Sequence, residues 1–148
     1  MAGKMSGGCQ CGRVRYTAQV ADDEAYLCHC RMCQRATGSV SIAFKNVRKA
    51  NVTWESAEPD WYASSPIANR PYCRECGTSL GFAHPDSDRM DLTVASFDAP
   101  SRFRPTSHFG AESMHRAWIN TEGLPEQRSD EYQPLTDRWM KAVGKLPD

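Results

Sequence analysis

The sequence has no long apolar run, no excess of charge of either sign and no internal repeat. No segment reaches the roughly 20 apolar residues that a membrane-spanning helix requires, and residues 1–10 lack the apolar stretch of a secretory signal peptide. Basic and acidic residues number 18 each, so the basic excess that is typical of nucleic-acid-binding proteins is absent. We therefore expect no membrane anchor, no nucleic-acid partner and a location in the reducing cytoplasm.

The length of 148 residues predicts one domain, 1–148, that buries a core without disulfides. Apolar and polar residues alternate with a period of two, bounded by glycine and proline turns, which predicts a mostly β fold. The expected strands are 14–19, 24–28, 40–44, 51–54 and 90–95. Helical spacing of apolar residues predicts short helices between Cys30 and Gly38 and over 135–143.

Cysteine, in contrast, is abundant. The seven cysteines form three clusters: Cys9 and Cys11; Cys28, Cys30 and Cys33; Cys73 and Cys76. In a reducing compartment, cysteines at this spacing hold metal more often than they form disulfides, and an odd number excludes complete pairing. A structural zinc takes four ligands, with thiolates at about 2.3 Å, whereas a catalytic zinc keeps three and leaves one position open. The sequence therefore predicts one closed and one open site.

Two partitions of the seven cysteines are compatible with their spacing. One joins the first and third clusters as the closed site and leaves the middle cluster open. The other joins the two C-x-x-C pairs and leaves Cys9, Cys11 and Cys28. The first partition is favoured because the middle cluster spans only six residues, 28–33, and needs no long-range closure. Since His29 alternates with Cys28 and Cys30, it is expected to face away from the metal.

Three segments around the clusters match the pattern of a known family. They are Gly7–Tyr16 (GGCQCGRVRY), Cys28–Arg35 (CHCRMCQR) followed by Gly38-Ser39, and Tyr72–Thr78 (YCRECGT). These segments resemble the glutathione-dependent formaldehyde-activating enzyme family, which shares its domain with centromere protein V. The resemblance runs from Gly7 to about Pro125 and includes a weaker tail around Pro105, His108 and Trp118.

The resemblance implies a β-tent fold of antiparallel sheets with short helices and two zinc ions. It assigns the first and third clusters, Cys9, Cys11, Cys73 and Cys76, to the structural zinc. It assigns the middle cluster, Cys28, Cys30 and Cys33, to the catalytic zinc. The implied reaction adds the thiol of glutathione to formaldehyde and gives S-hydroxymethylglutathione, which is a carbon–sulfur lyase reaction in reverse. Another thiol or small aldehyde is an open alternative.

Several residues are candidates for holding the substrate. Glutathione has two carboxylates, which favour arginine partners. Arg35 is the first candidate because it lies close to the open site in sequence; Arg13, Arg15 and Arg70 are weaker ones. Gln34 and Ser39 are candidate hydrogen-bonding groups. His108 matches a family histidine near the substrate cleft and is a candidate proton shuttle, and Trp118 is a candidate ligand contact.

Two other functions remain open at this point. In the first, the protein is a non-catalytic zinc or glutathione-binding module, or a carrier of the bound thiol. In the second, it is a structural scaffold in which a histidine completes the middle cluster. A monomer and a homodimer are both compatible with the sequence.

Overall fold

The computed structural model describes residues 3–147 and divides the chain into two compact units, Met1–His115 and Arg116–Asp148. All seven cysteines belong to the first unit, so the candidate site is built from that unit alone. That the two units act together as one domain stays a prediction.

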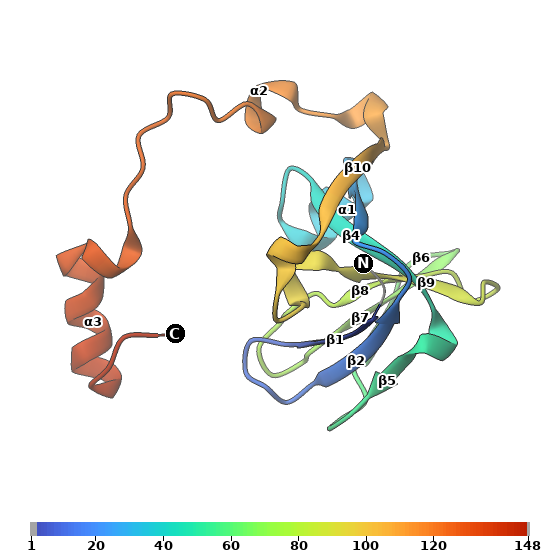
Figure 1. The fold of residues 1–148 in the computed structure, drawn as a ribbon, viewed down its shortest axis with the longest axis horizontal. Coiled ribbons are helices and arrows are strands. Elements are labelled where there is room, and N and C mark those ends of the chain that lie inside the picture. Colours follow the sequence, from blue (N-terminus) through green and yellow to red (C-terminus); the bar gives the residue numbers. More distant parts are fainter. Residues whose placement is uncertain (1–2, 148) are drawn as a thin grey trace. The chain divides into compact units, whose positions relative to one another are not determined.

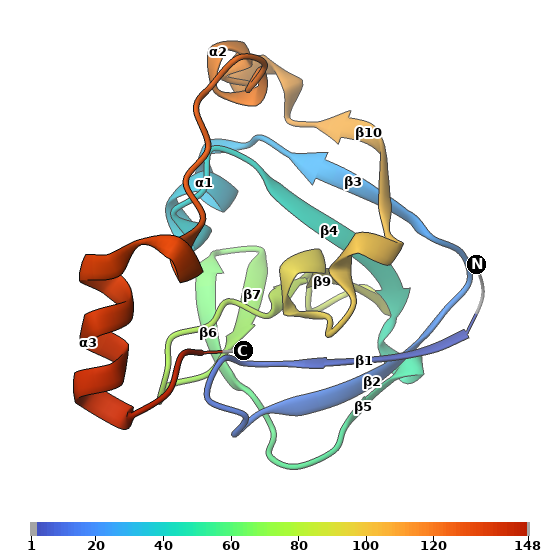
Figure 2. The ribbon, with the colours of Figure 1, turned by 60° about the vertical axis from the view of Figure 1, so that its left-hand side comes forward.

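The first unit is mostly β, as predicted, and contains two sheets (Figures 1 and 2). The three-stranded sheet has the order β1-β2-β5 and the seven-stranded sheet the order β10-β3-β4-β9-β8-β7-β6. The strands are β1 (Gly3–Gly8), β2 (Arg15–Val20), β3 (Glu24–Cys28), β4 (Ile42–Arg48), β5 (Val52–Trp54), β6 (Asp60–Ser65), β7 (Ala68–Tyr72), β8 (Gly81–Ala83), β9 (Arg89–Thr93) and β10 (Arg104–Phe109).

The pairing of β10 with β3 is an exception to the predicted antiparallel sheets. β10 runs parallel to β3, with His108 opposite Leu27 and Phe109 opposite Cys28, whereas the other paired strands of the described residues are antiparallel. The chain reaches β10 through two 3₁₀ turns, Val94–Ser96 and Pro100–Arg102, which let it return to the sheet edge in the direction of β3.

Helix α1 (Arg31–Thr37) lies where the sequence predicts it, and its ends have local causes. Cys30 is the residue before its first turn, and the Cys30 Sγ accepts a hydrogen bond from the Cys33 N–H at 3.4 Å. Gly38 ends the helix with φ of 72°, a left-handed conformation that favours glycine. The helix therefore holds two cysteines of the middle cluster in fixed positions at its start.

Two separate apolar clusters stabilise the first unit. The larger one lies around Tyr16, Leu80 and Leu92 and includes Cys9 and Cys73. The smaller one contains Cys28, Cys33 and Phe44. Each group of cysteines is thus anchored in its own part of the core, where burial of apolar surface fixes the backbone.

The close approach of β1 to the 3₁₀ turn Val94–Ser96 requires a glycine. A Cβ atom on Gly7 would lie 2.5 Å from the Ser96 carbonyl oxygen and from the Tyr16 ring. The Tyr16 hydroxyl and the Ser96 hydroxyl are hydrogen-bonded at 2.8 Å beneath it. Gly7, the first residue of the GGCQCG motif segment, therefore lets β1 pack onto the core just before Cys9.

The second unit contains α2 (Arg116–Ile119), a 3₁₀ turn (Ser129–Glu131) and α3 (Gln133–Val143), which confirms the predicted helix over 135–143. Helix α3 ends at Gly144 with φ of 73°. Across residues 3–147, we find no helix with the length and apolar character to cross a lipid bilayer.

Candidate functional site

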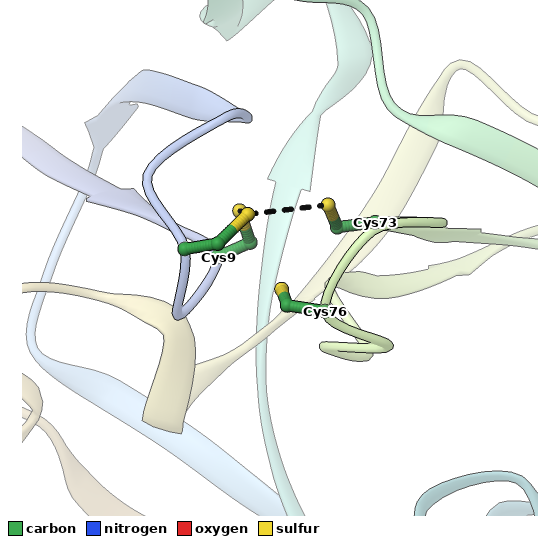
Figure 3. A group of neighbouring side chains, drawn as sticks. Cys9, Cys73 and Cys76 are labelled. Carbon is green, nitrogen blue, oxygen red and sulfur yellow. Dashed lines mark hydrogen bonds between the residues drawn. The ribbon is translucent and has the colours of Figure 1, made fainter. Parts of the chain in front are cut away.

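Four cysteines converge from two turns. Cys9 and Cys11 follow β1, and Cys73 and Cys76 follow β7, yet their four sulfur atoms all lie within 4.8 Å of one another. The Cys9 and Cys11 sulfurs are 3.6 Å apart, and the Cys11 and Cys73 sulfurs 3.8 Å apart. Figure 3 shows the side chains of Cys9, Cys73 and Cys76 directed toward a common centre. We call this group the four-cysteine site.

Both turns of the four-cysteine site have a local explanation. In the first, the Gly12 N–H donates to the Cys9 carbonyl at 3.2 Å and the Val14 N–H donates to the Cys9 sulfur at 3.3 Å. In the second, the Gly77 N–H donates to the Cys73 carbonyl at 2.7 Å, and Gly77 has a positive φ of 76°, which favours glycine. Such turns direct two nearby thiols to the same side.

Hydrogen bonds favour the thiolate form of two of these cysteines, Cys73 and Cys76. Although the Arg13 N–H lowers it, a hydrogen bond with Cys9 and burial together raise the pKa of Cys11 to about 11. Burial opposes ionisation of Cys73, but the backbone N–H groups of Cys76 and Glu75 and the Arg13 guanidinium lower its pKa. Arg13 Nη1 lies 3.9 Å from the Cys73 sulfur and 3.0 Å from Asp60 Oδ2. Burial likewise opposes ionisation of Cys76, but hydrogen bonds from Thr78 lower the pKa of Cys76 to about 5. Thiolates rather than thiols bind metals.

The middle cluster forms a second group, the three-cysteine site. Cys28 ends β3, Cys30 precedes α1 and Cys33 lies in its first turn, and their sulfurs lie within 4.8 Å of one another. The Cys28 and Cys30 sulfurs are 3.5 Å apart. Among residues 3–147, no histidine, aspartate or glutamate joins either group. The structure thus brings the cysteines together in the four-plus-three arrangement that the closure argument favours.

The donor sets and their spacing fit zinc. Four ligands at about 2.3 Å in tetrahedral geometry place the sulfurs about 3.8 Å apart, close to the distances of 3.5, 3.6 and 3.8 Å in the two groups. All seven cysteines are free thiols. Soft thiolate ligands in such a tetrahedral arrangement select zinc over hard cations. The two cysteine groups can therefore each hold one metal ion.

A buried arginine contacts the three-cysteine site. Arg70 lies on β7 with only 1% of its surface exposed, and its Nη2 is 3.4 Å from the Cys33 sulfur. Its guanidinium stacks over the Phe82 ring at 4.8 Å, and its Nε and Nη1 have no hydrogen-bond partner among the described residues. Arginine remains charged in proteins, and the Cys33 sulfur beside it is placed to act as the counter-ion of this buried charge.

The same contacts favour ionisation of Cys33. A hydrogen bond from the Cys28 thiol, and after it the Arg70 guanidinium, lower the pKa of Cys33 to about 5 although burial opposes this. The hydrogen bond with Cys33 and burial raise the pKa of Cys28. With a divalent ion bound, three thiolates would carry one net negative charge, and the positive charge of Arg70 would balance it.

A cavity of about 540 Å³ adjoins the three-cysteine site, and all three cysteines contribute to its lining. Aromatic side chains form much of the wall: Tyr26, Phe44, Phe82 and Phe109. The four-cysteine site contributes no residue to this cavity. Ligands can therefore reach the three-cysteine site from a preformed apolar cavity of the usual size for small-molecule sites.

Among the predicted substrate-binding residues, the structure places His108 and the weaker candidate Arg70 in the cavity wall. The His108 Nδ1 is 2.8 Å from Nε2 of the fully buried His29, which lies outside both cysteine groups, as predicted. Arg35 is exposed on α1 and does not line the cavity. The Ser39 hydroxyl donates to the Ser41 carbonyl, also away from the cavity lining. Trp118 lies on α2 in the second unit.

Gln34, predicted to bind substrate, is buried and makes hydrogen bonds within the protein. Its side-chain N–H donates to the His29 carbonyl at 2.6 Å and to the Ser113 carbonyl at 3.1 Å. Its Oε1 lies 3.2 Å from His115 Nε2. Gln34 is thus nearly completely buried and fixes the loop before α1 to the segment that follows β10.

A known protein family matches most of this chain. Residues 4–113 match the family described as glutathione-dependent formaldehyde-activating enzyme. This match covers about three quarters of the chain and contains both cysteine sites. The chain belongs to this family.

One curated relative and one solved structure are similar to this chain. The uncharacterized lyase C29B12.13 of Schizosaccharomyces pombe is 35% identical over 78 residues, which are 53% of this chain and 56% of the relative. The chain thus spans about half the length of that curated relative. A crystal structure of a Rhodobacter sphaeroides protein matches with a TM-score of 0.57 at 20% identity, over 70% of this chain and 99% of that one. That likeness supports the fold.

Sequence reasoning did not identify the contact of Arg70 with the three-cysteine site or the aromatic cavity wall. It places Arg70 behind Arg35 because Arg35 lies closer to the middle cluster in the sequence. The one signal in the sequence was the place of Arg70 three residues before Cys73, on the strand that enters the C-x-x-C turn. Phe82 and Phe109 carry no motif, so only the structure identifies them.

Proposed function

We propose that this protein is a zinc-dependent enzyme of the carbon–sulfur lyase type, which adds glutathione or a similar thiol to formaldehyde or another small aldehyde. The observation that carries the proposal is the three-cysteine site, which opens onto a cavity and has no fourth ligand among the described residues. A closed structural site would instead have four protein ligands, as the four-cysteine site does. The family membership and the relative named as a lyase support this assignment.

The residues of the three-cysteine site would hold the catalytic zinc, and the four-cysteine site would hold a structural zinc. When bound at three thiolates, zinc lowers the pKa of an incoming thiol and fixes its sulfur. Arg70 keeps the buried site close to electrical neutrality. The free thiols of both sites suit a reducing, cytoplasmic compartment.

The remaining groups position the aldehyde and move a proton. In the addition, a carbon–sulfur bond forms, the carbonyl π bond opens, and the oxygen takes a proton to become a hydroxyl. His108 is the candidate proton donor because it lines the cavity and its 2.8 Å contact with buried His29 fixes the orientation of its ring. The apolar walls exclude water from the reacting atoms.

The test is metal content and adduct formation in one preparation. Native mass spectrometry with and without millimolar glutathione is expected to show two zinc ions and a glutathione adduct at the open one. Exchange NMR of glutathione with ¹³C-formaldehyde is then expected to show faster interconversion with wild type than with Cys30→Ser. An adduct without acceleration would identify a thiol carrier instead. Two inert ions without an adduct would identify a structural scaffold.

A further inference from the structure

The cavity beside the three-cysteine site is large for a small aldehyde and is lined mainly by uncharged side chains. Its apolar lining combines the aromatic wall with Met32 and Ile67. Its volume of about 540 Å³ far exceeds the space that formaldehyde, with two heavy atoms, occupies. Formaldehyde adds little to the filling of the cavity beside a bound thiol, whereas a larger apolar group on the aldehyde would remove more of the aromatic wall from water, so the cavity favours such a group.

A carboxylate of a ligand finds no accessible arginine or lysine in this lining. Arg70 is the single arginine or lysine that lines the cavity, and its guanidinium is buried, with Nη2 on the Cys33 sulfur and its other nitrogens shielded from solvent. The acidic residue of the lining, Asp91, accepts a hydrogen bond from Asn46 at 2.9 Å and would repel an anion. A carboxylate placed among these side chains would lose hydration without gaining an ion pair.

We propose that this cavity binds the uncharged aromatic group of an aryl aldehyde, so that the enzyme acts on aromatic aldehydes in preference to formaldehyde. The inference rests on the proposed function and names its substrate class. The thiol sulfur bonds to the carbonyl carbon, the C=O π bond opens, and the thiol proton ends on the oxygen, giving a thiohemiacetal without any oxidation or reduction. The aryl ring packs edge to face against Phe82 and Phe109.

A pair of unreactive ligands tests the preference without relying on turnover. Benzyl alcohol and 4-(hydroxymethyl)benzoate have the same ring and hydroxymethyl group, differ in one carboxylate, and form no imines with lysine. Their dissociation constants are measured by ligand-observed NMR on the zinc-loaded full-length chain. We expect benzyl alcohol to bind at least tenfold more tightly.

A pair of variants localises the effect to the cavity. Ile67 lies in the turn between β6 and β7, is 63% exposed and lines the cavity, so a polar side chain there does not disturb the core. Ile67→Lys supplies the missing cation and should reduce the preference for benzyl alcohol at least threefold. Ile67→Gln has a similar size without the charge and should leave the preference close to that of wild type.

The outcomes separate this inference from the proposed function. Equal affinities, tighter binding of the benzoate, no binding of either ligand, or the same effect of both variants would overturn the aromatic preference, even if the enzyme adds glutathione to formaldehyde. A clear preference for benzyl alcohol that Ile67→Lys alone reduces would support the aromatic preference. If such a preference is found but thiol addition is not accelerated, the proposed catalytic function fails while the aromatic binding site stands.

Discussion

The Nη2 atom of Arg70 lies 3.4 Å from the sulfur of Cys33, a residue 37 positions earlier in the chain. The guanidinium is buried against Phe82 and cannot lose its proton. A buried charge without a counter-ion would be strongly destabilising. When β7 folds, it therefore brings a positive charge to Cys33 and stabilises the ionised form of the three-cysteine site.

Substitution of Arg70 by Met should weaken metal binding at the three-cysteine site more than it weakens the fold. Met has similar length and packs on Phe82, but it leaves the anionic cluster without its counter-charge. We expect a 10–100-fold loss of affinity for the open-site metal, measured by chelator competition. Arg70→Lys, which keeps the charge, should recover part of that loss; equal losses in both variants would show that charge is not the cause.

The two cysteine sites should respond differently to loss of one ligand. Cys73→Ser removes a fully buried ligand of the four-cysteine site and should cost more than about 4 kcal/mol of unfolding free energy, because structural metal binding contributes folding energy directly. Cys30→Ser should release only the open-site metal, since serine also caps the start of α1 well. Urea unfolding and metal analysis measure both effects. Equal destabilisation would contradict the division into structural and open sites.

Gly110 is expected to be essential for the position of Cys30. Its φ is 66°, and a Cβ atom would lie 2.8 Å from the Cys30 backbone nitrogen. Gly110→Ala should therefore displace Cys30 and weaken metal retention at the three-cysteine site at least tenfold, beyond the roughly 1–2 kcal/mol cost of the left-handed conformation. Gly123→Ala is the matched control because its φ is 77° and no atom lies within 4 Å. Similar metal retention in both variants would exclude a steric effect on Cys30.

His108→Gln tests the proposed proton transfer. The variant keeps a polar side chain beside His29 but removes the imidazole from the cavity wall, so kcat should fall about 10²-fold while metal content stays unchanged. His84→Gln is the control, because His84 lines the same cavity and contacts the Ile67 carbonyl instead of His29. An unchanged kcat for His108→Gln would remove His108 from the mechanism.

The stability of the four-cysteine site should depend on pH through Asp60. The Arg74 N–H, and with it the Arg13 guanidinium, hold the pKa of Asp60 below its usual value although burial opposes them. Asp60 therefore stabilises the fold above its ordinary pKa of about 3.9, and this stabilisation is lost as the pH falls through the lowered pKa. Asp60→Asn should lower the urea midpoint at pH 7, and its difference from wild type should shrink as the pH falls below about 4.

Asp88→Asn provides the control for that experiment. Asp88 also pairs with an arginine, Arg48, at 3.2 Å, but both side chains are more than 60% exposed. Exposed ion pairs contribute little to stability, so this variant should match wild type at each pH. A pH-independent deficit in Asp60→Asn would mean that its effect is one of packing.

Much of the fold could be predicted because, in some strands, apolar and polar residues alternate and clear turn residues mark the strand ends. In β2, buried Tyr16, Ala18 and Val20 alternate with more exposed residues, as the sequence indicated. β1 was not predicted, because Met5 is the single large apolar residue in its sequence, GKMSGG. Pairing with β2 stabilises this strand in the folded protein. β10 was missed because all its residues are exposed to some degree and none forms an apolar repeat.

The cysteine groups could be predicted to a greater degree than the rest of the site. Thiols two or three residues apart can reach one metal ion with little loss of chain entropy, so their spacing indicates shared sites. The contacts of Arg70 depend on which strands lie side by side, since β7 reaches α1 only through the folded sheet. Arg35, next to the cluster in sequence, points away because it lies on the exposed side of α1.

Strand β7 takes part in both cysteine sites. It carries Arg70, whose guanidinium contacts Cys33, and three residues later the chain provides Cys73 of the other site. A metal ion that fixes Cys73 thereby also fixes the backbone from which Arg70 extends. We expect the two metal equilibria to be linked with positive cooperativity and, by thermodynamic reciprocity, in both directions. The structural ion would then act as a regulator of the open site as well as a support for the fold.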